Sequence, residues 1–413
     1  MQLPPADAGG RNRPPNGTPR VSGQAQGKPI PTADWWTGLL TANDAILYNY
    51  PLSMRSTPTG LAMSFTFLGQ GANDTRQPMG PEQPIVLGVQ GLTGTYPTVS
   101  QHTDWTVTAS WNQSTRAFNA TMGLGMPFVY CTKGNTDVAS VVVNTGTVSI
   151  QSEMLLITNS IQNSSFAVYG PVGSTWVQAG NTYTSTLAGK NYFSAALLPS
   201  GTAAQTAANA YKQHAYVFPA NTEVSWQYNE ATAVLQSTYT VTPDVKEGSG
   251  TTVLMGLLPH QWDHLSATSP QPGSTTYATV RGTMKVLAGN SFVVENTFKG
   301  VLSALPNQGR YSTGFNPAAL QNKIDLVKNV QLSTWTDSYN EGLMMNQLVQ
   351  VAKIADQTGD TAARNQMLQT VKTRLENWLY ATPGENAFVF HYNDTWKTLI
   401  GYPSGHSSDA NLN

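Results

Sequence analysis

Residues 104–111 read Asp-Trp-Thr-Val-Thr-Ala-Ser-Trp, and this stretch decides the fold class of most of the chain. Apolar and small polar side chains alternate in it with a period of two residues. Such alternation is typical of a β-strand with one buried face, because successive side chains point to opposite faces of a sheet. The segment therefore predicts a half-buried strand.

Similar short segments recur on both sides of this stretch, separated by Gly, Asn, Pro and Ser. Many short strands with regular turn signals favour an antiparallel β-sandwich. We predict a large two-sheet sandwich over residues 30–255, with one helical interruption at Ala203–Tyr211. The segments that carry this prediction are LAMSFTF (61–67), PFVYCT (127–132), ASVVVNTGTVSI (139–150), EMLLITN (153–159), SFAVYG (165–170), EVSWQYN (223–229) and AVLQSTYTVTP (233–243).

The chain changes character before and after this region. Residues 1–29 are rich in Pro, Gly, Gln and Asn without periodicity, which predicts a disordered tail. Residues 256–333 mix strand-like segments (275–289 and 291–298) with a helix-like segment (316–331), which predicts a small α/β linker domain. Residues 334–413 then adopt a helical period, so the sequence predicts several domains, as its length of 413 residues also suggests.

Two amphipathic helices are predicted after residue 337, with a break at Gln357–Asp360 and Asp360 as the N-cap of the second helix. Helical hairpins of this kind need neighbours to bury their apolar stripes. No further helix signal follows Tyr380, so we predict a helical domain that is incomplete at Asn413. The stripes comprise Leu343, Met344, Leu348, Val351, Ile354 and Ala355, followed by Met367, Leu368, Val371, Leu375, Trp378 and Leu379.

Composition excludes several classes of function. The net charge is −1, from 22 basic and 23 acidic residues, which argues against a nucleic-acid partner and against an anionic membrane. Charged residues make up 11% of the chain, against about 25% in typical soluble domains. The surface must therefore consist mainly of neutral polar side chains, which suits a β-rich protein that handles uncharged, hydroxyl-rich ligands.

Few motifs of catalysis or metal binding are present. The single cysteine, Cys131, excludes a disulfide framework within the chain and a zinc site made of cysteines, and we interpret it as a buried thiol. His260 and His264 lie four residues apart after Pro259, in a segment that we interpret as a polar loop packed against a neighbouring domain. We predict no metal and no cofactor. No P-loop, dinucleotide fingerprint or nucleophile elbow is found.

Two carboxylates stand out by their surroundings. Asp394 lies in the segment His391–Trp396, and Asp409 follows Tyr402, so each has aromatic neighbours. Aromatic faces can stack on a sugar ring while carboxylates accept hydrogen bonds from its hydroxyl groups. The alternative is an aspartate in an Asx-turn beside ordinary core aromatic residues.

The segment Tyr392–Pro403 (YNDTWKTLIGYP), followed by 404–413 (SGHSSDANLN), resembles the signature region of glycoside hydrolase family 81, a family of endo-β-1,3-glucanases. Supporting segments are PTADWWTGLL (31–40), Tyr50-Pro51, GMPF (125–128), LPH (258–260) and DSY (337–339). The resemblance implies an N-terminal β-sandwich, a linker domain and the start of an (α/α) toroid.

The resemblance also implies a function. It predicts endo-hydrolysis of β-1,3-glucan by an inverting mechanism with two carboxylates, and the aspartate that opens the family's Asp-His-His motif would follow Asn413. No catalytic residue is then expected within this chain. The implied substrate-binding residues are Asp337, Tyr339, Tyr392, Asp394, Trp396, Tyr402 and Asp409. We expect an extracellular, monomeric protein, although no signal peptide is visible. A glucan-binding sandwich without catalysis is the alternative.

Overall fold

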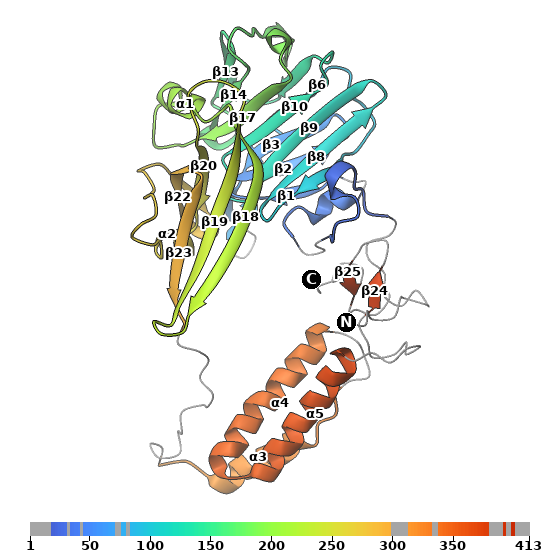
Figure 1. Ribbon diagram of the computed structural model, residues 1–413, viewed down its shortest axis with the longest axis vertical. Helices are drawn as coiled ribbons and strands as arrows, with labels where there is room; N and C mark the ends of the chain where they lie inside the picture. The colour runs from blue at the N-terminus through green and yellow to red at the C-terminus, as the bar shows by residue number, and fades with distance from the viewer. Residues whose placement is uncertain are drawn as a thin grey trace. The chain divides into compact units, whose positions relative to one another are not determined.

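The computed structural model describes residues 18–30, 34–41, 44–70, 76–79, 83–298, 313–332, 338–379, 391–393 and 398–400 (Figure 1). The chain divides into two compact units. The β unit comprises Arg20–Gln26 and Trp35–Lys299, and the helical unit comprises Met1–Pro19, Gly27–Asp34 and Gly300–Asn413.

Two antiparallel sheets form a β-sandwich in the β unit, as the alternating segments predict. In spatial order, the strands of the first sheet are β1 (Ile46–Tyr48), β2 (Leu52–Thr57), β3 (Gly60–Phe65), β6 (Ile85–Val89), β11 (Ala139–Val143), β16 (Thr182–Ser185) and β15 (Val177–Ala179). Those of the second sheet are β12 (Thr147–Gln151), β13 (Met154–Thr158), β14 (Ser165–Tyr169), β17 (Tyr192–Leu198), β10 (Phe128–Lys133), β9 (Arg116–Gly123), β8 (Thr106–Gln113) and β7 (Thr98–His102).

Large side chains from both sheets fill the space between them. Trp111 and Phe118 are fully buried, with ring centroids 5.3 Å apart. The Trp111 indole N–H donates a 2.8 Å hydrogen bond to the Thr57 carbonyl of the first sheet. Cys131 is buried on β10, as predicted, and burial raises the pKa of its thiol well above the usual range. The sandwich therefore has its own dense core.

Two further sheets follow the sandwich along the chain. One consists of β18 (Val217–Asn229), β19 (Val234–Val245) and β23 (Ser291–Thr297), and the other of β20 (Val253–Leu257), β22 (Gly282–Gly289) and β21 (Thr276–Thr279). The segments 223–229 and 233–243, which the sequence assigns to the sandwich, thus pair with each other and with β23 instead of with either sandwich sheet. Alternation predicts a strand but does not determine its partner. The domain boundaries proposed from the sequence stay a prediction.

Short elements complete the β unit. The expected helical interruption is α1 (Ala204–Lys212), which confirms the prediction, and α2 (Pro259–Trp262) is one helical turn. Backbone pairing joins β4 (Phe67–Gln70) to β5 (Arg76–Met79). The 3₁₀ turns are η1 (Gly23–Ala25), η2 (Thr37–Leu40), η3 (Ile161–Asn163) and η4 (Leu187–Gly189).

Three helices form the core of the helical unit: α3 (Pro317–Lys328), α4 (Ser338–Thr358) and α5 (Thr361–Leu379). The sequence predicted α4 and α5 from their periodicity, and α3 as a helix-like segment of the linker domain. Asp360 caps α5 as expected, since its carboxylate accepts a 2.9 Å hydrogen bond from the Ala363 N–H. Their core is a single cluster: Ile324, Leu348, Ala352, Ala355, Ala363, Met367 and Val371. A short pair of strands, β24 (His391–Asn393) and β25 (Thr398–Ile400), lies further along this unit. No described helix is long and apolar enough to span a membrane.

Candidate functional site

The substrate-binding residues implied by the sequence fall almost entirely outside the described residues. Tyr339 lies in the first turn of α4 and Tyr392 lies in β24, and for both only the backbone is described. The remaining five are outside the described ranges: Asp337, Asp394, Trp396, Tyr402 and Asp409. Their grouping into one binding face stays a prediction.

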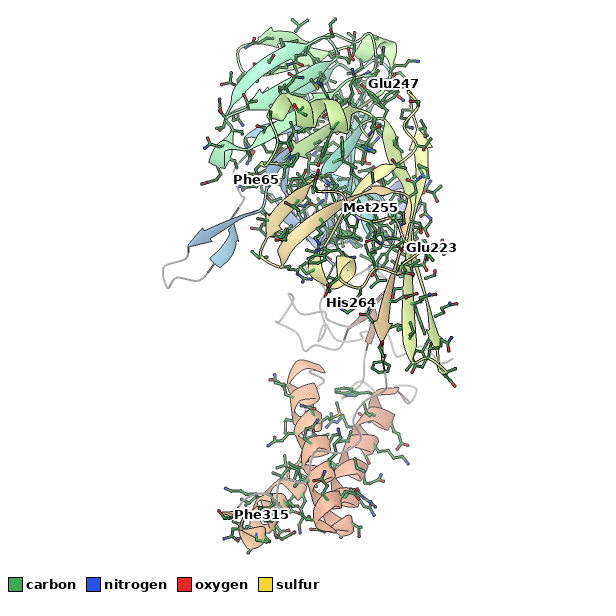
Figure 2. All side chains as sticks on the ribbon, turned by 90° about the vertical axis from the view of Figure 1, so that its left-hand side faces the viewer. Phe65, Glu223, Glu247, Met255, His264 and Phe315 are labelled. Atoms are coloured by element: carbon green, nitrogen blue, oxygen red, sulfur yellow. The ribbon has the colours of Figure 1, made fainter. Side chains whose placement is uncertain are left out.

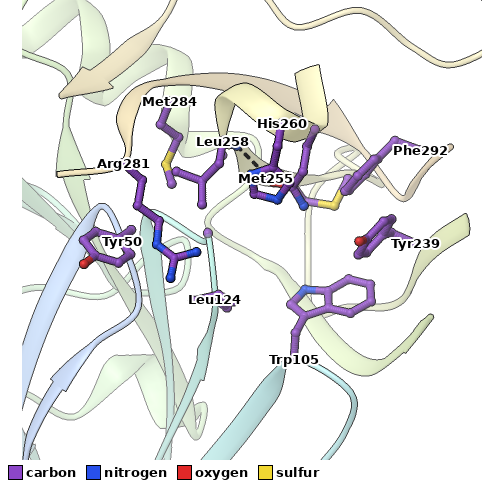
Figure 3. A pocket seen from close by; sticks show the side chains of 13 residues that line it. Tyr50, Trp105, Leu124, Tyr239, Met255, Leu258, His260, Arg281, Met284 and Phe292 are labelled. Atoms are coloured by element: carbon purple, nitrogen blue, oxygen red, sulfur yellow. Dashed lines mark hydrogen bonds between the residues drawn. The ribbon is translucent and has the colours of Figure 1, made fainter. Parts of the chain in front are cut away.

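The β unit itself contains a cavity of about 210 Å³ that mixes aromatic and polar walls (Figure 3). It lies between the three-stranded sheet that contains β19 and the segments around β20 and α2. Residues from several distant parts of the chain converge on it: Tyr50, Trp105, Leu124, Gly125, Tyr239, Met255, Gly256, Leu258, His260, Gln261, Arg281, Met284 and Phe292.

Three rings form the aromatic wall of the cavity. Tyr239 and Phe292 are directly opposed on β19 and β23, and their rings stack at 4.5 Å with an interplanar angle of 7°. Trp105 meets Tyr239 edge to face, with the centroids 5.8 Å apart. Figure 3 shows the three rings following one another along one side of the cavity. Together they offer flat apolar faces of the kind that stack on other flat groups.

The position of Trp105 is fixed by the turn between β7 and β8. The Trp105 N–H donates a 3.1 Å hydrogen bond to the Thr222 hydroxyl, and the Asp104 carboxylate accepts a 2.6 Å hydrogen bond from the Val224 N–H. Both bonds join this turn to β18. The sandwich therefore contributes one ring to a wall that the hairpin β18–β19 provides.

Close backbone contacts form the floor of the cavity. Gly125 has a φ of +83°, and a Cβ atom there would lie 2.7 Å from the Gly256 carbonyl oxygen. The Gly256 N–H donates a 2.6 Å hydrogen bond to the Gly125 carbonyl, and the Gly125 N–H donates to the Asn49 carbonyl at 2.7 Å. Only glycine combines this φ with such a close approach. These contacts hold Tyr50, the neighbour of Asn49, beside the cavity.

The polar groups come from α2 and from the β21–β22 turn. The Leu258 N–H donates a 2.9 Å hydrogen bond to the Gln261 side-chain carbonyl, which closes the first turn of α2 and places His260 at the cavity. The segment 259–262 is thus helical, so the prediction of a loop was wrong here, because Pro259 at the first position favours a helix start. Arg281 adds a guanidinium group from the opposite turn.

The chemistry of this cavity is that of binding. Among the residues that the structure describes, its lining includes no Asp or Glu, so these residues do not supply the two carboxyl groups that acid/base hydrolysis of a glycoside needs. It offers ring faces together with hydrogen-bond donors on Arg281, His260 and Gln261. That combination suits an uncharged ligand with several hydroxyl groups.

Three carboxyl groups elsewhere in the described part of the chain have hydrogen-bond partners that lower their pKa values. Burial pushes the pKa of Glu153 up, but the bonded ammonium of Lys212 and a backbone hydrogen bond together lower it. Lys328 lowers the pKa of Asp325, and the N–H of Ala363 lowers that of Asp360. A general acid needs a raised pKa, so these three groups are unsuited to that role. Within the described ranges, no group of three or more His, Cys, Asp or Glu side chains could hold a metal ion.

Several residues that line the cavity belong to segments that also carry the family resemblance. Tyr50, Gly125, Leu258 and His260 belong to the supporting segments of the family resemblance, and all four line it. Sequence reasoning missed the aromatic wall, although Trp105 opens the alternating segment 104–111. Tyr239 and Phe292 show only as ordinary strand residues, since their meeting depends on the pairing of β19 with β23.

Known proteins resemble this chain over almost all of its length. A protein of Thermobifida fusca named glucan endo-1,3-beta-D-glucosidase is 32% identical over 397 residues, which cover 94% of this chain and 50% of that protein. A protein of the same name from Acetivibrio thermocellus is 32% identical over 405 residues, or 93% of this chain and 49% of the relative. The chain thus spans about half the length of these curated relatives. No protein-family model matches the sequence.

The same relationship holds for the fold. A solved structure described as glycoside hydrolase family 81 from Clostridium thermocellum, in a mutant form, matches with a TM-score of 0.80 and 28% sequence identity. The match covers 98% of this chain and 55% of that one. By sequence and by fold, this chain is therefore similar to proteins named glucan endo-1,3-beta-D-glucosidase and to a solved structure described as glycoside hydrolase family 81.

Proposed function

We propose that this chain is the N-terminal part of an enzyme that cleaves internal β-1,3-glucosidic bonds of a β-1,3-glucan, such as laminarin or fungal-wall glucan. One observation carries the proposal. Similarity to two proteins named glucan endo-1,3-beta-D-glucosidase covers at least 93% of the chain, and the fold agrees. The cavity adds support, because its aromatic wall and hydrogen-bond donors suit a sugar.

The proposed reaction inverts the anomeric centre. One carboxylic acid protonates the leaving oxygen while a carboxylate activates a water molecule on the opposite face of the sugar, the two groups lying about 6.5–9.5 Å apart. We propose that both groups lie outside residues 1–413, and that residues 1–413 contribute glucan binding. A polymeric substrate of this size is met outside the cell, so we propose an extracellular, monomeric protein without a cofactor.

A binding assay tests the proposed substrate, and a hydrolysis assay tests the proposed placement of the catalytic carboxyl groups. The chain of 413 residues should be retarded by laminarin in affinity electrophoresis and not by hydroxyethyl cellulose, a neutral β-1,4 control. It should release no reducing sugar from laminarin, because loss of even one general acid or base costs about 10²–10⁴ in rate. Hydrolysis at the rate of a complete glucanase would contradict the proposal that both carboxyl groups lie outside residues 1–413. Equal retardation by both polymers would contradict the proposed preference for β-1,3-glucan.

The coding sequence after Asn413 distinguishes the enzyme from a glucan-binding protein without catalysis. A reading frame that continues into Asp-His-His and further helical hairpins supports the enzyme. A stop codon directly after Asn413 would leave glucan binding as the function of this polypeptide.

A further inference from the structure

One face of the sheet β18–β19–β23 carries a row of aromatic side chains, which we call the hairpin face. Directly opposed residues of antiparallel strands share a face, and every second residue along a strand returns to it. The register pairs Val224 with Tyr239 and Phe292, Trp226 with Ser237 and Val294, and Tyr228 with Leu235 and Asn296. Phe298 continues the alternation of β23. The hairpin face therefore comprises Val224, Trp226, Tyr228, Leu235, Ser237, Tyr239, Phe292, Val294, Asn296 and Phe298.

The hairpin face begins inside the cavity and ends in solvent. Tyr239 and Phe292 belong to the cavity wall. Toward the tip of the hairpin, Trp226 is 72% exposed, Tyr228 41% and Phe298 49%. Figures 1 and 2 both show β18 and β19 projecting beyond the sandwich sheets, with Glu223 marking β18 in Figure 2. The exposed rings are thus the outward continuation of the cavity wall.

The outer rings have a defined arrangement. The Tyr228 hydroxyl donates a 2.8 Å hydrogen bond to the Phe298 carbonyl, and the two rings meet edge to face with centroids 6.2 Å apart. Trp226 and Tyr228 lie two residues apart on one strand, a spacing of about 6.5–7 Å. A row of rings at such intervals can contact successive units of a linear polymer.

The opposite face of the same sheet is different. Gln227 donates to Gln236 at 2.9 Å, and Gln236 donates to Glu295 at 2.7 Å, which forms a polar ladder across the three strands. The sheet thus has one hydrogen-bonded polar face and one aromatic face. The exposed Trp226 therefore lies on the aromatic face of the sheet and not on the polar face. Exposed apolar patches of this kind are typical of binding surfaces.

We propose that the hairpin face is a platform for a neutral polysaccharide chain, which stacks its sugar rings on Trp226, Tyr228 and Phe298 and reaches the cavity at Tyr239. The ligand class rests on the proposed function. None of the ten side chains of the hairpin face is charged, which fits an uncharged polymer and disfavours nucleic acid or an acidic polysaccharide. Ser237 and Asn296 belong to the same face and supply hydrogen-bonding groups that sugar hydroxyls need.

The test measures laminarin binding by the chain and three variants. Trp226→Ala should raise the Kd about tenfold, equivalent to about 1.4 kcal/mol. Gln227→Ala changes the polar face of the same strand, leaves every ring of the hairpin face in place, and should bind like the parent chain. Phe315→Ala removes an exposed aromatic side chain of the helical unit, 42% exposed, and should change nothing. Far-UV circular dichroism verifies that each variant is folded.

The outcomes separate this inference from the proposed function. If the parent chain binds laminarin and Trp226→Ala binds equally well, the platform is wrong and the proposed function stands. If the parent chain binds no β-1,3-glucan, both fail. If the parent chain sediments as a dimer that Trp226→Ala converts to a monomer, the hairpin face is an interface between two copies, and the platform is overturned.

Discussion

The β unit and the helical unit differ in how well each buries its own apolar side chains. Among the described residues, every one of the largest fully buried side chains belongs to the β unit, including Trp36, Trp111 and Tyr130. Three of the seven buried residues in the described core of the helical unit are alanines. Leu343, Leu368 and Leu375 of the predicted stripes are 57%, 42% and 41% exposed.

This difference follows from geometry. Two sheets that pack face to face close a core between them, whereas a helical hairpin covers only part of each helix. Each apolar side chain of this size contributes roughly 1.5–3 kcal/mol when fully buried. We therefore expect the β unit to be the more stable of the two, and the following changes test that comparison from the largest effect to the smallest.

Trp111→Ala should have the largest effect. It opens a cavity in the sandwich core and removes the hydrogen bond to the Thr57 carbonyl, so the free energy of unfolding of the β unit should fall by about 3–5 kcal/mol. Calorimetry of the whole chain should show the β transition moving alone. Val172→Ala, at a residue that is 67% exposed, is the control and should cost less than about 0.5 kcal/mol. A loss below about 1 kcal/mol for Trp111→Ala would contradict the proposed core.

Gly125→Ala and Gly173→Ala form a matched pair. Both glycines have positive φ, +83° and +85°, so both variants carry similar backbone strain. Only at Gly125 does the new Cβ meet a backbone oxygen, since nothing lies within 4 Å at Gly173. Gly125→Ala should therefore lower the free energy of unfolding by about 1–3 kcal/mol more than Gly173→Ala does, as measured by denaturant unfolding. Equal losses would show that the contact between Gly125 and Gly256 does not constrain the cavity floor.

Asp360→Ala should weaken the helical unit alone. Loss of the cap leaves the Ala363 N–H without its acceptor and should cost about 1 kcal/mol. Asp360→Asn keeps an acceptor and should lose much less. Helix content followed at 222 nm against temperature measures the effect, and a shift of the sandwich transition would contradict the independence of the units.

Acid should weaken the two units in different pH ranges. Burial lowers the pKa of His214 from its usual 6.5, although its hydrogen bond with the Thr252 carbonyl opposes this. A depressed pKa means that the unfolded state binds the proton more readily, so the β unit should lose stability as the pH falls below about 6.5. Asp325 and Asp360 have pKa values below 3.8, so their contribution to the helical unit should be lost only at lower pH. Urea unfolding at pH 7 and pH 5 measures this effect. His214→Gln should reduce the difference between the two pH values in the free energy of unfolding of the β unit.

Local patterns predicted the elements of this fold better than their partners. Alternation in residues 104–111 found β8 (Thr106–Gln113), and the helical period with its break at Gln357–Asp360 found α4 and α5 with the correct cap. The pairing of β19 with β23 joins residues about fifty to sixty positions apart, and no local signal specifies it. The residues 217–245 therefore looked like further sandwich strands.

The candidate site shows the same limit. Each ring of the cavity wall lies in an ordinary strand or turn, so sequence alone could not bring Trp105, Tyr239 and Phe292 together. The residues that the sequence did favour, such as Asp394 and Trp396, carry a local aromatic and acidic pattern but lie outside the described residues. Their role in substrate binding stays a prediction.

Hydrogen exchange of the whole chain, with and without a laminarin oligosaccharide, tests the account most directly. We expect low amide protection in Leu343–Leu379 and high protection in the sandwich strands, because the hairpin leaves apolar residues exposed. The oligosaccharide should slow exchange in β18 and β19 and leave the helices unchanged. Protection of Leu343–Leu379 equal to that of the sandwich, or a ligand effect confined to the helices, would contradict the account.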